Sequence, residues 1–340
     1  MSTDTKMKKG IIVENAPDIL GLTFRGFHGE EDYPYMADII NTMKVDDETE
    51  WTVSAENIAR DYQHLVRCDT EKDMLFAEVD GEVVGYSRCM WDEELNGDYL
   101  YSHFVNLKPD WRGTGIGKAM SQHQQKRLLE IAGKHPADAP KFFQVWGSDT
   151  QTWWDQLVTE DGFEVVRYGL TMTRPCSKPL DPLPLPEGLE VRLVKEEHYR
   201  QIWEADQEAF QDHWGYVPGT EENYKDWLGH RYFQPHLWKV AWDGDEVVGM
   251  VGNFIAEDEN EEYERKRGYT EDIFVRRQWR RQGVARSLLT QSVVMFQEMG
   301  MEETCLGVDT QNPNGAKGLY ESVGYKEIKR FMTYRKAMNE

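Results

Sequence analysis

The chain has 340 residues, which exceeds one ordinary domain and suits two domains of about 150 to 170 residues each. Its 61 acidic residues outnumber its 39 basic ones, and a formal net charge of -22 argues against binding to nucleic acid or to an anionic membrane. No stretch approaches the roughly 20 apolar residues of a membrane span, and we expect a cytoplasmic protein. The four cysteines lie far apart without a CxxC pair, which indicates free thiols and no metal site.

Five prolines mark a boundary near the middle of the chain. The segment over residues 175–188 reads PCSKPLDPLPLPEG, which favours an extended conformation and excludes a helix. We therefore expect an N-terminal domain over residues 1–174, a proline-rich linker over 175–188 and a C-terminal domain over 189–340.

The same order of elements is predicted on both sides of that segment. In the first half we expect strands at 73–78, 82–91 and 99–107, a helix at 116–132, a strand at 142–146, a helix at 152–158 and a strand at 163–173. In the second half we expect strands at 237–242, 246–254 and 270–275, a helix at 284–299, a strand at 302–308, a helix at 315–323 and a strand at 325–335. This order predicts two α/β domains of the α+β type, each with a mixed, mostly antiparallel sheet flanked by helices.

A basic, glycine-containing turn joins the third strand to the long helix in each half. The turns read RGTGIG from Arg112 and RRQGVA from Arg280, and their constant offset, since 280 minus 112 is 168, indicates an internal duplication. Glycine lets backbone N–H groups approach a ligand, and a helix N-terminus offers unpaired donors to an anion such as a pyrophosphate. A Walker A loop is excluded by Arg112 and Ala119, and a Rossmann motif by Lys118 and Met120 at its last glycine position.

Both turns match the pattern (Q/R)-x-x-G-x-(G/A), and in this respect the chain resembles the GNAT acetyltransferases. The resemblance implies acetyl-CoA as the donor substrate, with its pyrophosphate at the turn and its pantetheine between two splayed strands. The implied contacts are Arg112, Gly113, Thr114, Gly115, Ile116 and Gly117 in the first half, and Val275, Arg280, Arg281, Gln282, Gly283, Val284 and Ala285 in the second.

Only the second half carries a further segment that resembles this family. Residues 308–325, VDTQNPNGAKGLYESVGY, are similar to the N-x-x-(G/A)-A-x-x-L-Y-E-x-x-G-(F/Y) ending of many GNAT enzymes. The resemblance assigns Asn312 to the positioning of pantetheine and Tyr320 to the protonation of the departing thiolate, a role that suits a phenol with a pKa of about 10. The first half lacks the Asn and the Leu-Tyr pair, so we expect a non-catalytic N-terminal domain; a first domain that uses a different acid stays open.

A carboxylate is needed near the acceptor, because an amine must lose a proton before it attacks a thioester. Glu271 and Asp272 belong to a run, EDIFV, that resembles the acidic pair of spermidine/spermine-type acetyltransferases. Adjacent strand residues face opposite sides, so we expect one of the two to reach the site. Many GNAT enzymes carry the base eleven residues before the first residue of the turn, and that position is Tyr269 here. The alternative is that both carboxylates balance neighbouring arginines.

Residues 209–216, AFQDHWGY, fall where GNAT domains place the loop that shapes the acceptor site. The resemblance makes His213 and Trp214 candidate substrate contacts, with ordinary packing as the alternative. Together with the tandem arrangement and the ending of the second half, this loop resembles mycothiol synthase-like tandem GNAT proteins. That resemblance implies a small-molecule amine as the acceptor.

The sequence thus predicts an acyltransferase, namely an acetyl-CoA-dependent N-acetyltransferase in which a primary amine attacks directly in the C-terminal domain. Two other functions are compatible with it: transfer to a protein or peptide amine, and CoA sensing without turnover. We expect a monomer or a homodimer without a metal, a nucleic acid or a membrane as partner.

Overall fold

The computed structural model describes residues 10–338, which divide into two compact units. The first unit comprises residues up to Val166 together with the segment from Thr333 onward, and the second unit comprises Arg167–Met332. These limits differ from the predicted boundaries at residues 174 and 189. The difference arises because two long strands, β6 (Glu164–Pro175) and β12 (Lys326–Ala337), each begin in one unit and end in the other.

The first unit is a mixed sheet flanked by helices, as the sequence predicted. Its strands follow the order β1 to β5, and only β4 and β5 pair in parallel. The strands are β1 (Leu22–Arg25), β2 (Met74–Val79), β3 (Glu82–Glu93), β4 (Tyr99–Leu107) and β5 (Lys141–Ser148). The helices are α1 (Tyr33–Met43), α2 (Ala55–Asp61), α3 (Thr70–Asp73), α4 (Ile116–Ala132) and α5 (Thr152–Glu160).

The second unit repeats this arrangement. From the free edge inward its strands follow the order β7, β8, β9, β10, β11 and β6, and only β10 and β11 are recorded as a parallel pair. The strands are β7 (Glu190–Arg192), β8 (Lys239–Asp243), β9 (Glu246–Phe254), β10 (Arg267–Val275) and β11 (Glu303–Asp309). The helices are α6 (Tyr199–Phe210), α7 (Glu221–Gly229), α8 (Glu257–Glu262), α9 (Val284–Glu298) and α10 (Ala316–Val323).

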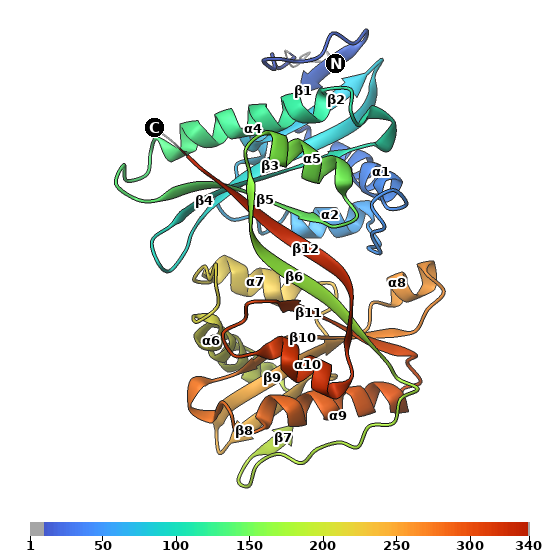
Figure 1. Ribbon diagram of the computed structural model, residues 1–340, viewed down its shortest axis with the longest axis vertical. Helices are drawn as coiled ribbons and strands as arrows, with labels where there is room; N and C mark the ends of the chain where they lie inside the picture. The colour runs from blue at the N-terminus through green and yellow to red at the C-terminus, as the bar shows by residue number, and fades with distance from the viewer. Residues whose placement is uncertain (1–9, 339–340) are drawn as a thin grey trace, which may run out of the picture. The chain divides into compact units, whose positions relative to one another are not determined.

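Helices cover both faces of the second sheet (Figure 1). Ala241 packs in one apolar cluster with Leu288 of α9, whereas its neighbour Val240 packs in another with Ile202 of α6. Successive side chains of a strand point to opposite faces, so α9 and α6 sandwich the sheet. The cavity described below opens in the sheet between these two layers.

The proline-rich segment is an ordered part of the second unit rather than a free linker. Arg174, which is 2% exposed, donates to the carbonyl oxygens of Val323, Pro175 and Lys178 at 2.8, 3.0 and 2.9 Å. Further along the segment, the carbonyl of Leu183 accepts a hydrogen bond of 2.7 Å from Ser287 of α9. The segment therefore lies against α9, and side chains of Arg174 and Ser287 supply donors to its carbonyl groups, since a proline-rich sequence has few backbone N–H donors of its own.

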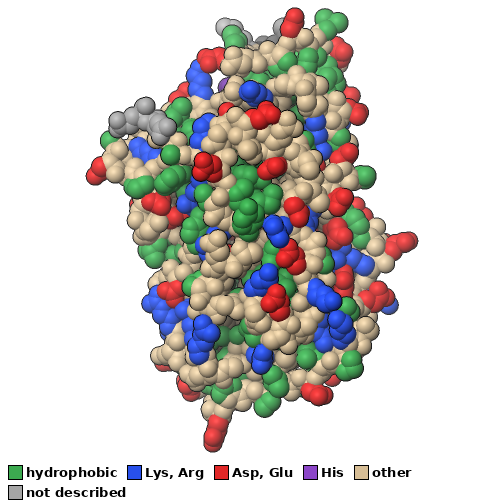
Figure 2. Space-filling model, viewed as in Figure 1, with side chains coloured by type: hydrophobic (Ala, Val, Ile, Leu, Met, Phe, Trp, Pro, Cys, Tyr) green, Lys and Arg blue, Asp and Glu red, His purple; other side chains and the backbone are tan. Residues whose placement is uncertain are grey.

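Acidic and basic side chains are interspersed on the face drawn in Figure 2, and the described residues form no continuous basic surface there. Such a surface is what the phosphate backbone of a nucleic acid requires. Within residues 10–338, no helix combines the length and the apolarity needed to cross a bilayer.

We expect Arg174→Met to lower the free energy of unfolding of the second unit by about 3 kcal/mol, because methionine fills the space but leaves several buried carbonyls unpaired. Lys225→Met, which removes an exposed ion pair of 3.0 Å with Glu222, is the matched control and should change the stability by less than about 0.5 kcal/mol. Urea unfolding followed by circular dichroism measures both. Equal stabilities of the two variants would contradict the anchoring role of Arg174.

Candidate active site

A cavity of about 750 Å³ opens in the second unit where β10 and β11 separate. The recorded parallel ladder between these strands ends at Tyr269 and Cys305. Beyond that point β10 continues along β9 as far as Val275, and β11 continues along β6 as far as Asp309. The cavity is lined by the separated strand ends, the turn before α9, and the start of α10.

Both predicted carboxylates line the cavity, because β10 carries a bulge. Glu271 pairs with Gly252 of β9 and Phe274 pairs with Met250, so β10 contains one residue more than β9 over this stretch. Asp272 lies at the bulge with a φ of 47°. A bulge interrupts the alternation of side chains, and the expectation that only one of the pair would reach the site was therefore wrong.

Glu271 bridges the gap between the strands. Its Oε1 accepts a hydrogen bond of 2.9 Å from the backbone N–H of Gly307 on β11. Burial, and then the charge of Asp272, raise the pKa of Glu271 to about 8, although the hydrogen bond acts in the opposite direction. Burial also raises the pKa of Asp272, which remains accessible from the cavity. At neutral pH these carboxyl groups can exchange protons with an amine.

Asp206 on α6 is a third carboxyl group near this pair, and sequence reasoning missed it. Burial and the charge of Asp272 raise the pKa of Asp206 to about 8. Its Oδ2 accepts a hydrogen bond of 3.3 Å from the Gln207 amide. No local signal in the sequence could have found Asp206, because only the packing of α6 on the sheet brings it close to β10.

Tyr320 of α10 lines the cavity and is 5% exposed. Burial and the charge of Glu271 raise the pKa of Tyr320 above its usual range, so the phenol stays protonated at all pH values of interest. Asn312 lines the same cavity, and its Oδ1 accepts a hydrogen bond of 2.8 Å from the backbone N–H of Asn314 in the turn that leads into α10.

The turn before α9 leaves open space in front of the helix. Gly283 is the N-cap residue with a φ of 91°, and a Cβ atom added there would meet nothing within 4 Å. The backbone conformation therefore favours glycine, and the helix N-terminus stays accessible to an anion. Among the predicted contacts, Val275, Arg280, Arg281, Gly283, Val284 and Ala285 line the cavity. Gln282 lies outside this lining, and its amide donates to the Gln278 carbonyl at 3.0 Å.

Arg280 lines the cavity, but its guanidinium group is bound by the protein. It donates to the carbonyls of Val275 and Ala209, both at 2.9 Å, and its Nη1 donates to Asp212 at 2.7 Å. The side chain thus fastens the end of α6 to the turn. Positive charge near the cavity comes in addition from Arg281 and Arg286.

Only some residues of the predicted acceptor loop line the cavity. His213 lines it, and burial lowers the pKa of His213, which favours the neutral imidazole. Trp214 lies outside the lining, with its ring 5.2 Å from the guanidinium carbon of Arg167.

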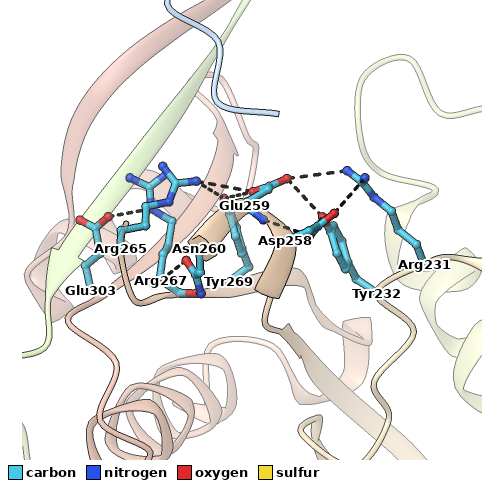
Figure 3. Close-up of polar contacts among 9 residues, drawn as sticks. All are labelled: Arg231, Tyr232, Asp258, Glu259, Asn260, Arg265, Arg267, Tyr269 and Glu303. Carbon is cyan, nitrogen blue, oxygen red and sulfur yellow. Dashed lines mark hydrogen bonds and ion pairs between the residues drawn. The ribbon is translucent and has the colours of Figure 1, made fainter. Parts of the chain in front are cut away.

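Tyr269, which occupies the position of the base in many GNAT enzymes, belongs to a network that holds α8 against β10 (Figure 3). Its hydroxyl donates to Glu259 Oε2 at 2.7 Å. Glu259 is buried and also pairs with Arg265 at 3.5 Å and Arg231 at 3.7 Å. The network makes Tyr269 a structural residue in this chain.

The equivalent turn of the first unit is covered by the chain's own N-terminal segment. Gly115 has a φ of 96° and caps α4, but a Cβ atom added there would lie 3.4 Å from Pro17. Asn15 donates to Gln122 of α4 at 3.4 Å, and Glu14 pairs with Lys126 one turn further along. Residues 14–17 therefore follow the exposed side of α4 up to its N-terminus.

The side chains around this turn also pack against one another. Arg112 forms an ion pair of 2.9 Å with Asp47, which is 1% exposed, and its guanidinium carbon lies 4.7 Å from the centre of the Trp153 ring. The same indole lies 3.4 Å from the position that a Cβ atom on Gly117 would take. The other predicted contacts are Gly113 with a φ of 75°, Thr114, whose hydroxyl donates to the Trp111 carbonyl, and the fully buried Ile116.

The fold consists of two similar units. A family model described as "Acetyltransferase (GNAT) family" matches residues 36–135 and 198–325, so the chain belongs to this family and is an acyltransferase. The two matched segments confirm the predicted tandem arrangement.

Two further similarities extend over most of the chain. It is 27% identical over 270 residues to a mycothiol acetyltransferase from Geodermatophilus obscurus, covering 78% of this chain and 82% of that protein. A GCN5-related N-acetyltransferase from Sphaerobacter thermophilus superimposes with a TM-score of 0.71 and 25% identity, covering 95% of this chain and 97% of that one. A tandem GNAT protein from the clavulanic acid biosynthesis pathway shares the fold with a TM-score of 0.64 at 13% identity, covering 94% of this chain and 99% of that one.

The two matching turns of the sequence predict two CoA sites, but the structure leads us to expect one molecule of CoA per chain, because the turn before α9 is open whereas Pro17 and Trp153 cover the turn before α4. Gly283→Val and Gly115→Val are matched variants, since both place a branched side chain at a left-handed N-cap glycine. Isothermal titration with CoA should give a stoichiometry of one for the wild type and for Gly115→Val, and an affinity at least about tenfold weaker for Gly283→Val. Two CoA molecules per wild-type chain would contradict this expectation.

Proposed function

We propose that the second unit transfers the acetyl group of acetyl-CoA to the primary amine of a small molecule by direct attack. The observation that carries the proposal is the cavity between β10 and β11. A single space of about 750 Å³ joins an open helix N-terminus to two carboxyl groups and a protonated phenol. These are the groups that binding of an anionic donor, deprotonation of an amine and protonation of a leaving thiolate require.

The residues present suit acetyl-CoA, which supplies an activated thioester when it is bound. Backbone N–H groups at the start of α9, with Arg281 and Arg286 nearby, offer donors and positive charge to the pyrophosphate. The parallel pairing of β10 with β11 ends at Tyr269, so the backbone groups of β10 that follow on this side can form hydrogen bonds with the amides of pantetheine.

The proton transfers follow from the two altered pKa values. The amine nitrogen forms a bond to the thioester carbonyl carbon, and its proton passes to the Glu271 carboxylate, either directly or by way of Asp272. The C–S bond then breaks, Tyr320 donates its hydroxyl proton to the departing sulfur, and the proton held by Glu271 returns to the Tyr320 phenolate, which restores both groups. The negative charge of the Glu271 carboxylate raises the pKa of Tyr320 and so opposes loss of the phenolic proton. When Glu271 gains a proton, this opposing charge is removed.

The acceptor is proposed from charge and from the relatives. Glu271 and Asp272 favour a cationic group that becomes a neutral nucleophile on loss of one proton. The Geodermatophilus relative is named as a mycothiol acetyltransferase, which supports a small amine rather than a protein amine. Transfer to a peptide amine and CoA binding without turnover are the competing functions.

A CoA-release assay with a panel of small amines and N-terminal peptides tests this function. We expect turnover with at least one small amine, and Tyr320→Phe should lower kcat by about 100-fold while CoA affinity changes little, because the phenol acts only after binding. Tyr325→Phe is the matched control, since Tyr325 is buried beside Tyr320 but lies outside the cavity lining. Turnover with peptides alone would favour the protein acetyltransferase, and CoA binding without any turnover would favour the sensor.

The pH dependence should reveal Glu271. Its pKa is raised to about 8, so the basic form accumulates as the pH rises through 8, and kcat/KM should fall about tenfold per pH unit below that value. In Glu271→Gln this limb should disappear, leaving only the titration of the acceptor amine, which is common to both proteins. Identical pH profiles for the variant and the wild type would exclude Glu271 as the base.

A further inference from the structure

We propose that Asp212 is a positioning residue that couples the CoA turn to the acceptor loop, residues 209–216. The inference rests on the proposed function. It gives a role to Asp212, which contacts neither the donor nor the acceptor in the proposed complex. Asp212 lies just after the end of α6, outside the cavity lining, and is one residue before His213.

Two arginines of the segment between β10 and α9 bind this one carboxylate. Arg280 donates to Asp212 Oδ2 at 2.7 Å, and Arg277 donates to the same oxygen through Nε at 2.8 Å and to Oδ1 through its second nitrogen. Hydrogen bonds from Arg277 and then Arg280 hold the pKa of Asp212 far below its usual range. The contact is therefore ionised and bidentate at any physiological pH.

Arg280 connects this carboxylate to the backbone on both sides of the cavity. Its Nη2 donates to the carbonyl of Ala209 at the end of α6, and its Nε donates to the carbonyl of Val275 at the end of β10. Arg280 is also the first residue of the turn whose backbone faces the CoA pyrophosphate in the proposed complex. One side chain thus joins the donor turn, the last residue of β10 and the acceptor loop.

The acceptor loop has a second anchor at β6 and the end of β11. The guanidinium of Arg167 on β6 stacks on the Trp214 ring, pairs with Asp309 and donates to the side chain of Gln311 at 2.8 Å. Asp309 lines the cavity at the end of β11. Between the anchors at Asp212 and Trp214 lies His213, whose ring contacts Phe210 with centroids 4.4 Å apart. The position of His213 is set by both anchors.

The physical consequence is a link between donor binding and loop order. An anion bound at the turn restricts the backbone from Arg280 to Gly283, and that restriction passes through the guanidinium of Arg280 to Asp212. A loop that is already ordered binds its next ligand at a lower entropic cost, which gives positive coupling between donor and acceptor. The competing explanation is that Asp212 merely neutralises two arginines that would otherwise bind the phosphates of CoA.

Hydrogen exchange of the full chain with CoA as the probe distinguishes these explanations. In the wild type we expect CoA to slow exchange of the amides in the acceptor loop. In Asp212→Asn the loop amides should exchange at least about threefold faster and should no longer respond to CoA, while the CoA dissociation constant from calorimetry changes less than about threefold. Glu190→Gln, which removes an exposed pair of 2.6 Å with Arg192, is the control and should match the wild type.

Steady-state kinetics with the best amine of the panel provide the second measurement. We expect Asp212→Asn to raise the KM of the amine about tenfold with kcat changed less than about threefold, and Asp212→Glu to restore much of the loss. A loop that keeps its CoA response in Asp212→Asn, or CoA binding that becomes several-fold tighter, would overturn the coupling role. Because exchange and calorimetry need no turnover, a failure of this inference is distinguishable from a failure of the proposed function, which would appear as absent turnover in the wild type.

Discussion

The end of the parallel ladder between β10 and β11 at Tyr269 and Cys305 is the constraint on which the second unit depends. A continuous ladder would fill the sheet with backbone hydrogen bonds and leave no space between the strands. Its interruption exposes strand edges, admits a ligand into the middle of the sheet and lets Glu271 reach across to the Gly307 N–H. The bulge at Asp272 adds a second carboxylate, which would face the other side of the sheet if the strand alternated regularly.

The two units show how one topology supports different functions. In both, a glycine in the left-handed region caps a long helix behind the central strands. In the second unit the space in front of this cap is open, whereas in the first unit Pro17, Trp153 and the ion pair of Arg112 with Asp47 surround it. The backbone turn that both units share therefore keeps its shape, while its capacity to bind an anion depends on the side chains around it.

The charged side chains around the cavity of the second unit comprise arginines near the turn before α9 and carboxyl groups on β10 and α6. Asp212 forms an ion pair with Arg280, so the positive charge available to an incoming anion comes from Arg281 and Arg286, which line the cavity. Burial and repulsion by the charge of Asp272 raise the pKa values of Glu271 and Asp206 to about 8, and burial raises the pKa of Asp272. A cationic acceptor would relieve that repulsion on entry, so the same crowding that tunes the base also favours the proposed substrate.

The sequence by itself determined the local elements and the order in which they recur. The helix at 116–132 and the strands at 99–107 and 246–254 were predicted with their observed limits, because periodicity and turn glycines act over a few residues. It also determined the tandem GNAT arrangement, since the two turns and the ending of the second half are contiguous motifs. Only the tertiary structure decided the bulge at Asp272, the approach of Asp206 and the covering of the first turn by Pro17. These depend on contacts between residues far apart in the chain, and local patterns carry no information about them.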